Sequence, residues 1–183
     1  MKYEARKLAL TDGRTCVLRS AEKQDAPEML RYMVQVLSET PYLLSTPEEF
    51  AQMPLEQEES FIGSTLSAER AVMITAFDGD RIIGSADLRA VGSRMRVQHR
   101  CGMGITILKE YWGVGLGSAL MEAVIACAKQ LGYEQLELEV MAENRRAISL
   151  YTKYGFQVCG CLPNKVRYAD GTYAADYQMY KTL

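Results

Sequence analysis

The first half of the chain alternates short apolar runs with amphipathic stretches. Apolar residues dominate 71–77 and 81–90, and the intervening Asp78-Gly79-Asp80 predicts a hairpin turn between two strands. An earlier strand is predicted over 15–20. Apolar positions at helical spacing predict helices over 25–39 and 54–67, the first with Pro27 in its opening turn.

The second half predicts strand, helix, strand, helix and a closing hairpin. A strand over 96–108 leads into a helix over 115–131, whose apolar stripe occupies positions 116, 120, 123, 124, 127 and 131 and which Gly132 ends. Alternation over 136–141 predicts another strand. Asn144 then caps a short helix that ends at Gly155, and Phe156 begins a strand whose return turns at Asp170-Gly171. This order predicts a mixed α/β sheet in one domain spanning residues 1–183.

Composition narrows the class of protein. The chain has 183 residues, 48% of them hydrophobic, and no apolar run near the roughly 20 residues of a membrane span. The polar N-terminus is unlike a signal peptide, so we expect a cytoplasmic protein without membrane association. A net charge of −2 and the lack of a basic tract argue against nucleic acid as a partner. Five cysteines without a Cys-x-x-Cys pair, and one histidine, indicate buried thiols and no metal.

A glycine-rich turn is the main candidate for chemistry. Gly113, Gly115 and Gly117 lie where the run 104–108 gives way to the long helix, and the free N–H groups of a helix start attract phosphate. Walker A requires Lys-Ser or Lys-Thr after the last glycine, but Ser118 and Ala119 follow here. The fingerprint of dinucleotide-binding domains requires two intervening residues before its third glycine, but only Leu116 separates Gly115 from Gly117. The glycines alone are equally compatible with a tight strand-to-helix connection.

A second motif favours the phosphate-binding interpretation of the turn over a purely structural one. Together, WGVGLGSAL at 112–120 and NRRAISLYTKYGF at 144–156 resemble the acetyl-CoA loop and the following signature of the GCN5-related N-acetyltransferases, or GNAT family. The resemblance covers roughly residues 71–161. It implies a single-domain fold with a mixed, mostly antiparallel central sheet flanked by helices. It also implies an N-acetyltransferase that uses acetyl-CoA as cosubstrate and a primary amine as acceptor.

The resemblance assigns roles to individual residues. Tyr151 matches the tyrosine that protonates the CoA sulfur, although half-buried packing is its simpler role. Asn144 matches a residue that touches the pantetheine arm, yet an N-cap role would also explain it. The cofactor-binding set implied is Ile105, Thr106, Ile107, Trp112, Gly113, Val114, Gly115, Leu116, Gly117, Ser118, Asn144 and Tyr151. Four basic residues either lie near the phosphates or only solvate helix faces: Lys109, Arg145, Arg146 and Lys153.

Two positions depart from the family pattern. Trp112 replaces a common Gln or Arg, which we expect binding to tolerate because the loop acts through main-chain amides. Gly102 stands where many relatives carry a glutamate general base. The base is therefore open among a water relay, His99 and a carboxylate such as Glu139.

The acceptor is specified less well. Residues 33–69 hold seven glutamates and no Lys or Arg, which favours a cationic amine unless these charges only solvate helix faces. The closing hairpin, with Tyr173, Tyr177 and Tyr180, is expected to form the other rim of the acceptor cleft. The sequence does not distinguish a small-molecule amine from a peptide or protein amine as acceptor. It also leaves undecided whether the protein forms a homodimer and whether the acyl group is longer than acetyl. The alternative to an enzyme is a non-catalytic acyl-CoA-binding module, whereas the glycine spacing disfavours nicotinamide-dinucleotide binding.

Overall fold

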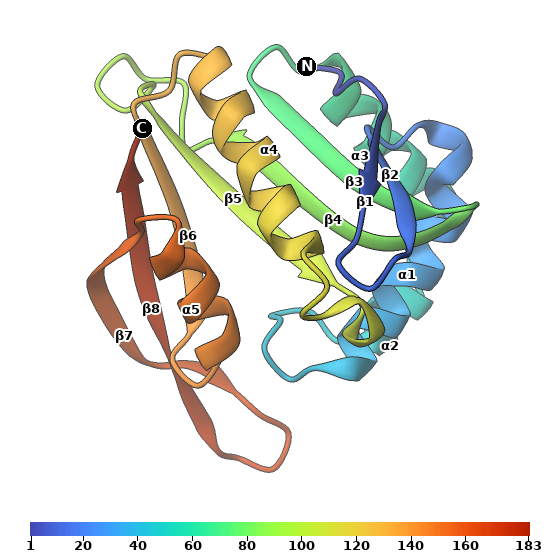
Figure 1. The fold of residues 1–183 in the computed structure, drawn as a ribbon. Coiled ribbons are helices and arrows are strands. Elements are labelled where there is room, and N and C mark those ends of the chain that lie inside the picture. The colour runs from blue at the N-terminus through green and yellow to red at the C-terminus, as the bar shows by residue number, and fades with distance from the viewer.

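The computed structural model describes residues 1–183 as one eight-stranded mixed sheet with helices on both faces (Figure 1). The strands are β1 (Arg6–Ala9), β2 (Thr15–Arg19), β3 (Ala71–Asp78), β4 (Arg81–Ala90), β5 (Arg100–Ile107), β6 (Gln135–Met141), β7 (Gln157–Arg167) and β8 (Tyr173–Thr182). The helices are α1 (Ala26–Glu39), α2 (Pro47–Ala51), α3 (Leu55–Ser67), α4 (Leu116–Gln130) and α5 (Arg145–Lys153), with 3₁₀ turns at Lys23–Asp25 and Lys109–Tyr111.

The centre of the sheet is divided where β5 meets β6. The strand order is β1-β2-β3-β4-β5-β6-β8-β7, and every neighbouring pair is antiparallel except β5 and β6. These two parallel strands pair only between Arg100–Gly102 and Gln135–Glu137, and then diverge (Figure 1). The fold therefore has two sheet halves joined at one end and open at the other.

The core forms where helices cover the first half of the sheet. Leu116 and Leu120 of α4 are fully buried and approach Gly84 of β4, where an added Cβ would meet the Leu116 side chain at 3.3 Å. On the opposite face, α1 and α3 bury Tyr32 and Ile62. No helix of the fold combines the length and apolar character that crossing a membrane requires.

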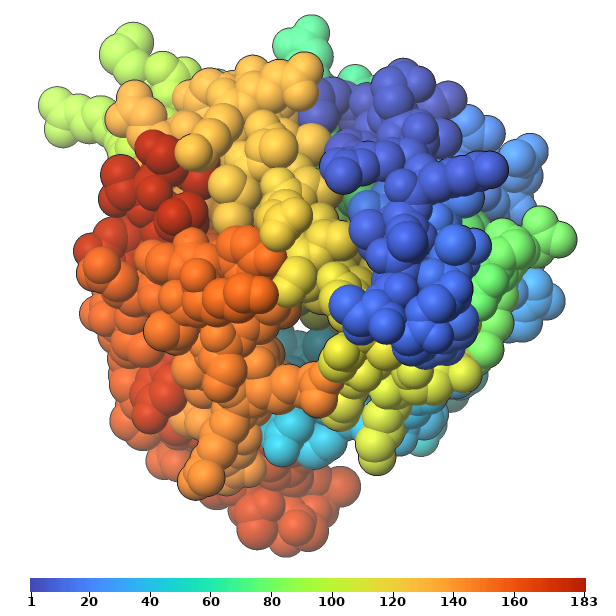
Figure 2. Space-filling view, viewed as in Figure 1, coloured from blue at the N-terminus to red at the C-terminus, as the bar shows by residue number.

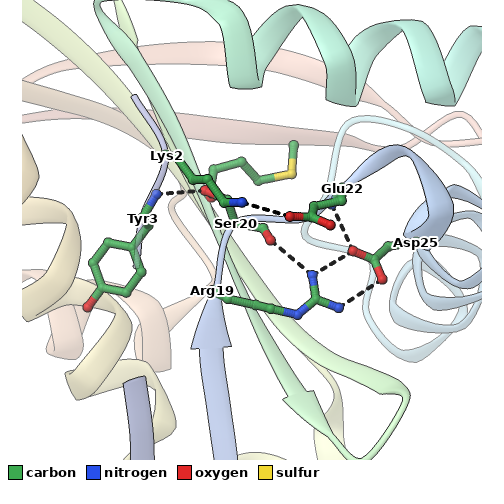
Figure 3. Close-up of polar contacts among 7 residues, drawn as sticks. Lys2, Tyr3, Arg19, Ser20, Glu22 and Asp25 are labelled. Carbon is green, nitrogen blue, oxygen red and sulfur yellow. Dashed lines mark hydrogen bonds and ion pairs between the residues drawn. The ribbon is translucent and has the colours of Figure 1, made fainter. Parts of the chain in front are cut away.

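A polar network fixes where α1 begins relative to β2 (Figure 3). Arg19, the last residue of β2, donates two hydrogen bonds to Asp25 at 2.6 and 2.8 Å, and Asp25 also accepts the Glu22 N–H at 2.7 Å. Ser20 accepts the Tyr3 N–H and donates to the Met73 carbonyl of β3. Bidentate and charge-assisted contacts of this kind are directional, so the network orients α1 against the sheet.

The mixed sheet, the alternation of helices and strands along the chain and most element bounds agree with the sequence-based prediction. Two short elements were missed, β1 and α2, and the strand predicted over 96–108 begins only at Arg100 because 96–99 form a turn. The prediction of buried thiols holds for Cys16, Cys101 and Cys127. It is wrong for Cys159 and Cys161, which are exposed because β7 is an edge strand.

The closed end of the split should depend on the ion pair between Arg100 of β5 and Glu137 of β6. Arg100 donates from Nε to Oε1 and from Nη2 to Oε2, the latter at 2.8 Å, and this pairing lowers the pKa of the Glu137 carboxyl below its usual 4.5. We expect Glu137→Gln to reduce the free energy of unfolding by about 1 kcal/mol at pH 7. Because the folded pKa is lowered, this contribution is present above pH 4.5 and disappears as the pH falls through the folded value.

Urea unfolding at pH 7 and in acid measures this difference. The exposed pair between Lys2 and Glu22 supplies the control, since Glu22→Gln should change stability by less than half as much. An equal loss in the two variants, or a loss for Glu137→Gln that persists in acid, would show that the pair does not hold the strands together.

Candidate functional site

The divergence of β5 and β6 opens into a cavity of about 1150 Å³. Figure 2 shows its mouth between the start of α4, the orange α5 and the blue N-terminal segment. Side chains from α1 and α3 line one end, and the glycine-rich turn and α5 line the other. Such a cavity at an opening in a sheet is large enough for an extended cosubstrate together with a second substrate.

One wall of the cavity is the free edge of β5. Ile105, Thr106 and Ile107 all line it, and they pair with β4 on one side only. Alternate N–H and C=O groups of this stretch therefore point into the opening, as at any unpaired sheet edge. The Tyr32 hydroxyl donates to Thr106 Oγ1 at 2.8 Å and fixes that side chain. The geometry suits an extended amide-bearing ligand that pairs with β5 as an added strand would.

The glycine-rich turn presents a continuous set of free N–H donors. From Gly113 to Ser118, no backbone N–H donates to an acceptor within the protein. Gly113 and Gly115 adopt left-handed φ values of 80° and 93°, which disfavour residues with a side chain. Free amides at the start of a 15-residue helix form a site for an anion such as pyrophosphate.

The residues of the turn contribute in different ways. Trp112, Gly113, Gly115, Gly117 and Ser118 line the cavity, but Val114 and Leu116 do not. The Val114 carbonyl accepts the Thr11 N–H, and the Leu116 side chain lies in the core. For these two residues only the main-chain N–H is left to serve a ligand.

Trp112 and basic side chains complete the anion end. The Trp112 indole donates to the Ile107 carbonyl at 2.8 Å, which ties the turn to the end of β5, and the Arg146 guanidinium lies 4.9 Å from its ring centroid. Arg145, Arg146 and Lys153 line the cavity. Lys109 does not line the cavity, and its main-chain N–H donates to a carboxylate oxygen of Glu39 at 2.6 Å.

Asn144 and Tyr151 reach the cavity from α5. Asn144 Oδ1 accepts the Ala147 N–H at 3.1 Å, so its N-cap role is present, and the residue also lines the cavity. Tyr151 packs its ring at 5.9 Å from Phe156, while its hydroxyl has no protein hydrogen-bond partner. Burial raises the pKa of Tyr151, so this phenol stays protonated and available as a proton donor.

The candidates for the general base differ in whether they line the cavity. Gly102 lies at the closed end of the split, paired with Arg89 and Glu137, and does not line the cavity. His99 also lies outside it. Glu139 does line the cavity, but its carboxylate accepts a hydrogen bond from Lys165 at 2.9 Å.

Sequence analysis missed two carboxylates that the fold brings to the cavity. Asp87 projects from the middle of β4, and Glu58 lies on α3 with only 4% of its surface exposed and no hydrogen-bond partner for its side chain. Burial raises the pKa of both carboxyl groups. Asp87 alternates with Ser85 and Arg89 along β4, and Glu58 is one of seven glutamates in 33–69, so neither residue carries a sequence signal that sets it apart.

The predicted acceptor rims need correction. Of the seven glutamates in 33–69, only Glu58 lines the cavity, and the others serve caps or solvated faces. The closing hairpin does not provide the second rim: Tyr173, Tyr177 and Tyr180 lie outside the cavity because β8 pairs β7 with β6 and carries them away from the split. Glu139, Val140 and Glu143 occupy that wall instead.

Comparison with known proteins places this geometry in a family. The family model described as "Acetyltransferase (GNAT) family" matches residues 31–156. The L-amino acid N-acetyltransferase AaaT of Escherichia coli is 32% identical over 108 residues, covering 58% of this chain and 65% of that protein. The chain thus spans somewhat less than two thirds of that relative's length.

Solved structures agree over almost the whole chain. The GNAT-family acetyltransferase of Streptococcus pneumoniae superposes with a TM-score of 0.85 at 30% identity, covering 92% of this chain and 99% of that one. A putative acetyltransferase from Salmonella typhimurium, solved with its cofactor acetyl-CoA, has the same fold, with a TM-score of 0.79 at 15% identity over 92% and 94% of the two chains. This chain belongs to the GNAT acetyltransferase family, as the family-model match, the superposed structures, the divided sheet and the glycine-rich turn together show.

Proposed function

We propose that the protein is an acetyl-CoA-dependent N-acetyltransferase that transfers the acetyl group to a primary amine by direct attack. The observation that carries the proposal is the run of free N–H groups from Gly113 to Ser118, which lines the same cavity as the unpaired edge of β5. A pyrophosphate and an amide-bearing arm in succession are the features of CoA that such a surface would complement.

The residues present fit acetyl-CoA from one end to the other. The amides of the glycine-rich turn would hold the pyrophosphate, with Arg146 and Lys153 beside it. The edge of β5 at 105–107 would pair with the pantetheine arm, and Asn144 faces it from α5. When bound, acetyl-CoA supplies an activated acyl group on a thiol leaving group. The structure of the Salmonella protein with acetyl-CoA supports this occupant through the shared fold.

Tyr151 is the proposed general acid. The departing sulfur needs only modest assistance because thiols have a pKa near ~8.5. A phenol with a raised pKa and an unsatisfied O–H can donate a proton to that sulfur without ionising in the resting enzyme. Its place on α5, packed against Phe156, holds the hydroxyl in the cavity.

The acceptor end of the cavity favours a cationic amine. Glu58 is a buried carboxylate without a protein partner, and burying such a group is costly unless a cation neutralises it. A second ammonium group on the acceptor would provide that partner. The AaaT match supports a small-molecule acceptor, since that relative is an L-amino acid N-acetyltransferase.

Replacement of Tyr151 tests the acid. We expect Tyr151→Phe to lower kcat for acetyl transfer roughly tenfold to a hundredfold, with little change in acetyl-CoA affinity, because the ring packing is kept and only the proton donor is lost. Thiol release measures turnover and calorimetry measures affinity. Tyr180→Phe, outside the cavity, is the matched control and should leave both values unchanged. A Tyr151→Phe enzyme with full turnover would eliminate the role.

Replacement of Glu58 tests the acceptor class. We expect Glu58→Gln to raise the KM for 1,4-diaminobutane about tenfold and to leave the KM for n-butylamine nearly unchanged, since only the diamine has a second charge for the carboxylate. Glu56→Gln, an exposed change on the same helix, is the control. Equal effects of Glu58→Gln on the KM values of the two amines would contradict the proposal that Glu58 binds a second ammonium group. A wild-type protein that binds acetyl-CoA but acetylates no amine would support the non-catalytic alternative.

A further inference from the structure

The register of β4 against β5 places a carboxylate beside the free strand edge. Asp87 pairs in register with Gly104, and both line the cavity one residue before the stretch at Ile105. The Asp87 side chain is 31% exposed, and that surface belongs to the cavity lining. Its Oδ2 accepts a hydrogen bond from Arg89 at 2.9 Å.

Gly104 provides the space that the carboxylate occupies. A Cβ added at Gly104 would lie 2.7 Å from Asp87 Oδ1, closer than side chains tolerate. By contrast, a Cβ at Gly102, two residues earlier on the same strand face, would meet only the Glu137 carbonyl at 4.0 Å. A side chain at position 104 of β5 would therefore displace the Asp87 carboxylate from its present position, and in this chain the carboxylate is supplied by β4.

We propose that Asp87 is the general base that deprotonates the acceptor amine. Position 104 is occupied by glycine because any side chain there would displace the Asp87 carboxylate. The proposal rests on the acetyltransferase function proposed above. Asp87 lies on the strand adjacent to the free edge of β5, whereas Glu58 approaches from α3 and suits the distal end of the acceptor. His99 is outside the cavity. Glu139 and Asp87 each accept one hydrogen bond from a basic side chain at 2.9 Å, so Asp87 is distinguished by its position beside the free edge of β5.

The proton balance is complete with the groups named. An amine of pKa about 10.4 is neutral in roughly one molecule in 2,500 at pH 7, so a proton must leave before attack. Asp87 takes that proton from the ammonium group and later releases it to solvent. The neutral nitrogen forms a bond to the acetyl carbon as the carbon–sulfur bond breaks. Tyr151 protonates the sulfur, and the second proton lost by the nitrogen restores the phenol.

The surroundings of Asp87 suit a base. Burial raises the pKa of its carboxyl, and the positive charge of Arg89 opposes that rise without cancelling it. The other ionisable groups that line the cavity away from its glycine-rich turn are Glu58 of α3, Tyr42 of the loop after α1, and Glu139 and Glu143 of β6 and the loop after it. A carboxylate with a raised pKa accepts a proton more readily than an ordinary aspartate.

A double-mutant cycle tests the pair with 1,4-diaminobutane as acceptor. We expect Asp87→Ala to lower kcat about a hundredfold or more, and Gly104→Ala to lower it at least tenfold in the wild-type background. In the Asp87→Ala background, Gly104→Ala should have no further effect, because the clash that it creates is gone. Gly102→Ala is the matched control and should keep wild-type turnover.

Two further readouts separate a base from a structural residue. The deficit of Asp87→Ala should shrink about tenfold per pH unit as the pH rises toward the pKa of the amine, since the neutral acceptor needs no base. In calorimetry with the CoA complex and no acetyl donor, Asp87→Ala should weaken 1,4-diaminobutane binding about tenfold. Thermal unfolding checks that each variant folds.

The contrary outcomes are distinct. Turnover of Asp87→Ala within threefold of wild type, a deficit that is constant with pH, or a Gly104→Ala loss that persists without Asp87 would each overturn the assignment. A wild-type protein that releases no CoA with any amine would instead overturn the proposed function together with it.

Discussion

The requirement that backbone hydrogen-bonding groups find partners organises this molecule. A sheet interior normally satisfies each N–H and C=O through its neighbours, but β5 and β6 separate after three paired residues. Beyond Gly102, the free edge of β5 lines the same cavity as the turn at 113–118, whose N–H groups also lack acceptors. The chain thereby concentrates its unsatisfied main-chain groups along one wall of one cavity. A ligand with complementary hydrogen-bonding groups would satisfy these N–H and C=O groups.

The cavity is electrically divided along its length. At the α4 and α5 end, main-chain donors combine with Arg145, Arg146 and Lys153 to favour an anion. At the α1 and α3 end, Glu58 and Asp87 place carboxylates among apolar side chains. A cosubstrate with phosphates at one end and an amine acceptor at the other would meet complementary charge in both halves. The amine and the acetyl group would then meet between the two ends of the cavity.

Local chemistry explains which elements were predictable. The glycine-rich turn, the N-cap at Asn144 and the left-handed Gly155 act over three or four residues, and the structure has them where expected. The missed β1 has four residues and the missed α2 has five, too few to show a period. Helix α2 nevertheless carries a capping box between Thr46 and Glu49, a local signal that could have been found.

Non-local pairing explains the rest. The relation between Asp87 and Gly104 depends on the register of β4 against β5, which no local pattern specifies. Likewise, Cys159 and Cys161 are exposed because β7 takes the sheet edge, and the hairpin tyrosines miss the cavity because β8 inserts between β6 and β7. The glycine spacing indicated the turn and the family resemblance supplied Tyr151, but the resemblance also directed attention to Gly102 on β5. The carboxylate beside the free edge comes from the neighbouring strand.

Every step proposed for this site requires that the free amides of the glycine-rich turn and the open edge of β5 together bind acetyl-CoA. Calorimetric titration of the purified protein with acetyl-CoA, and with NAD as a pyrophosphate-containing control, measures this binding. We predict one acetyl-CoA bound per chain with a micromolar Kd (on the order of 10⁻⁶ M, or about −8 kcal/mol) and no response to NAD. The absence of acetyl-CoA binding, or equal binding of NAD, would contradict this role of the turn and leave it a structural connection between β5 and α4.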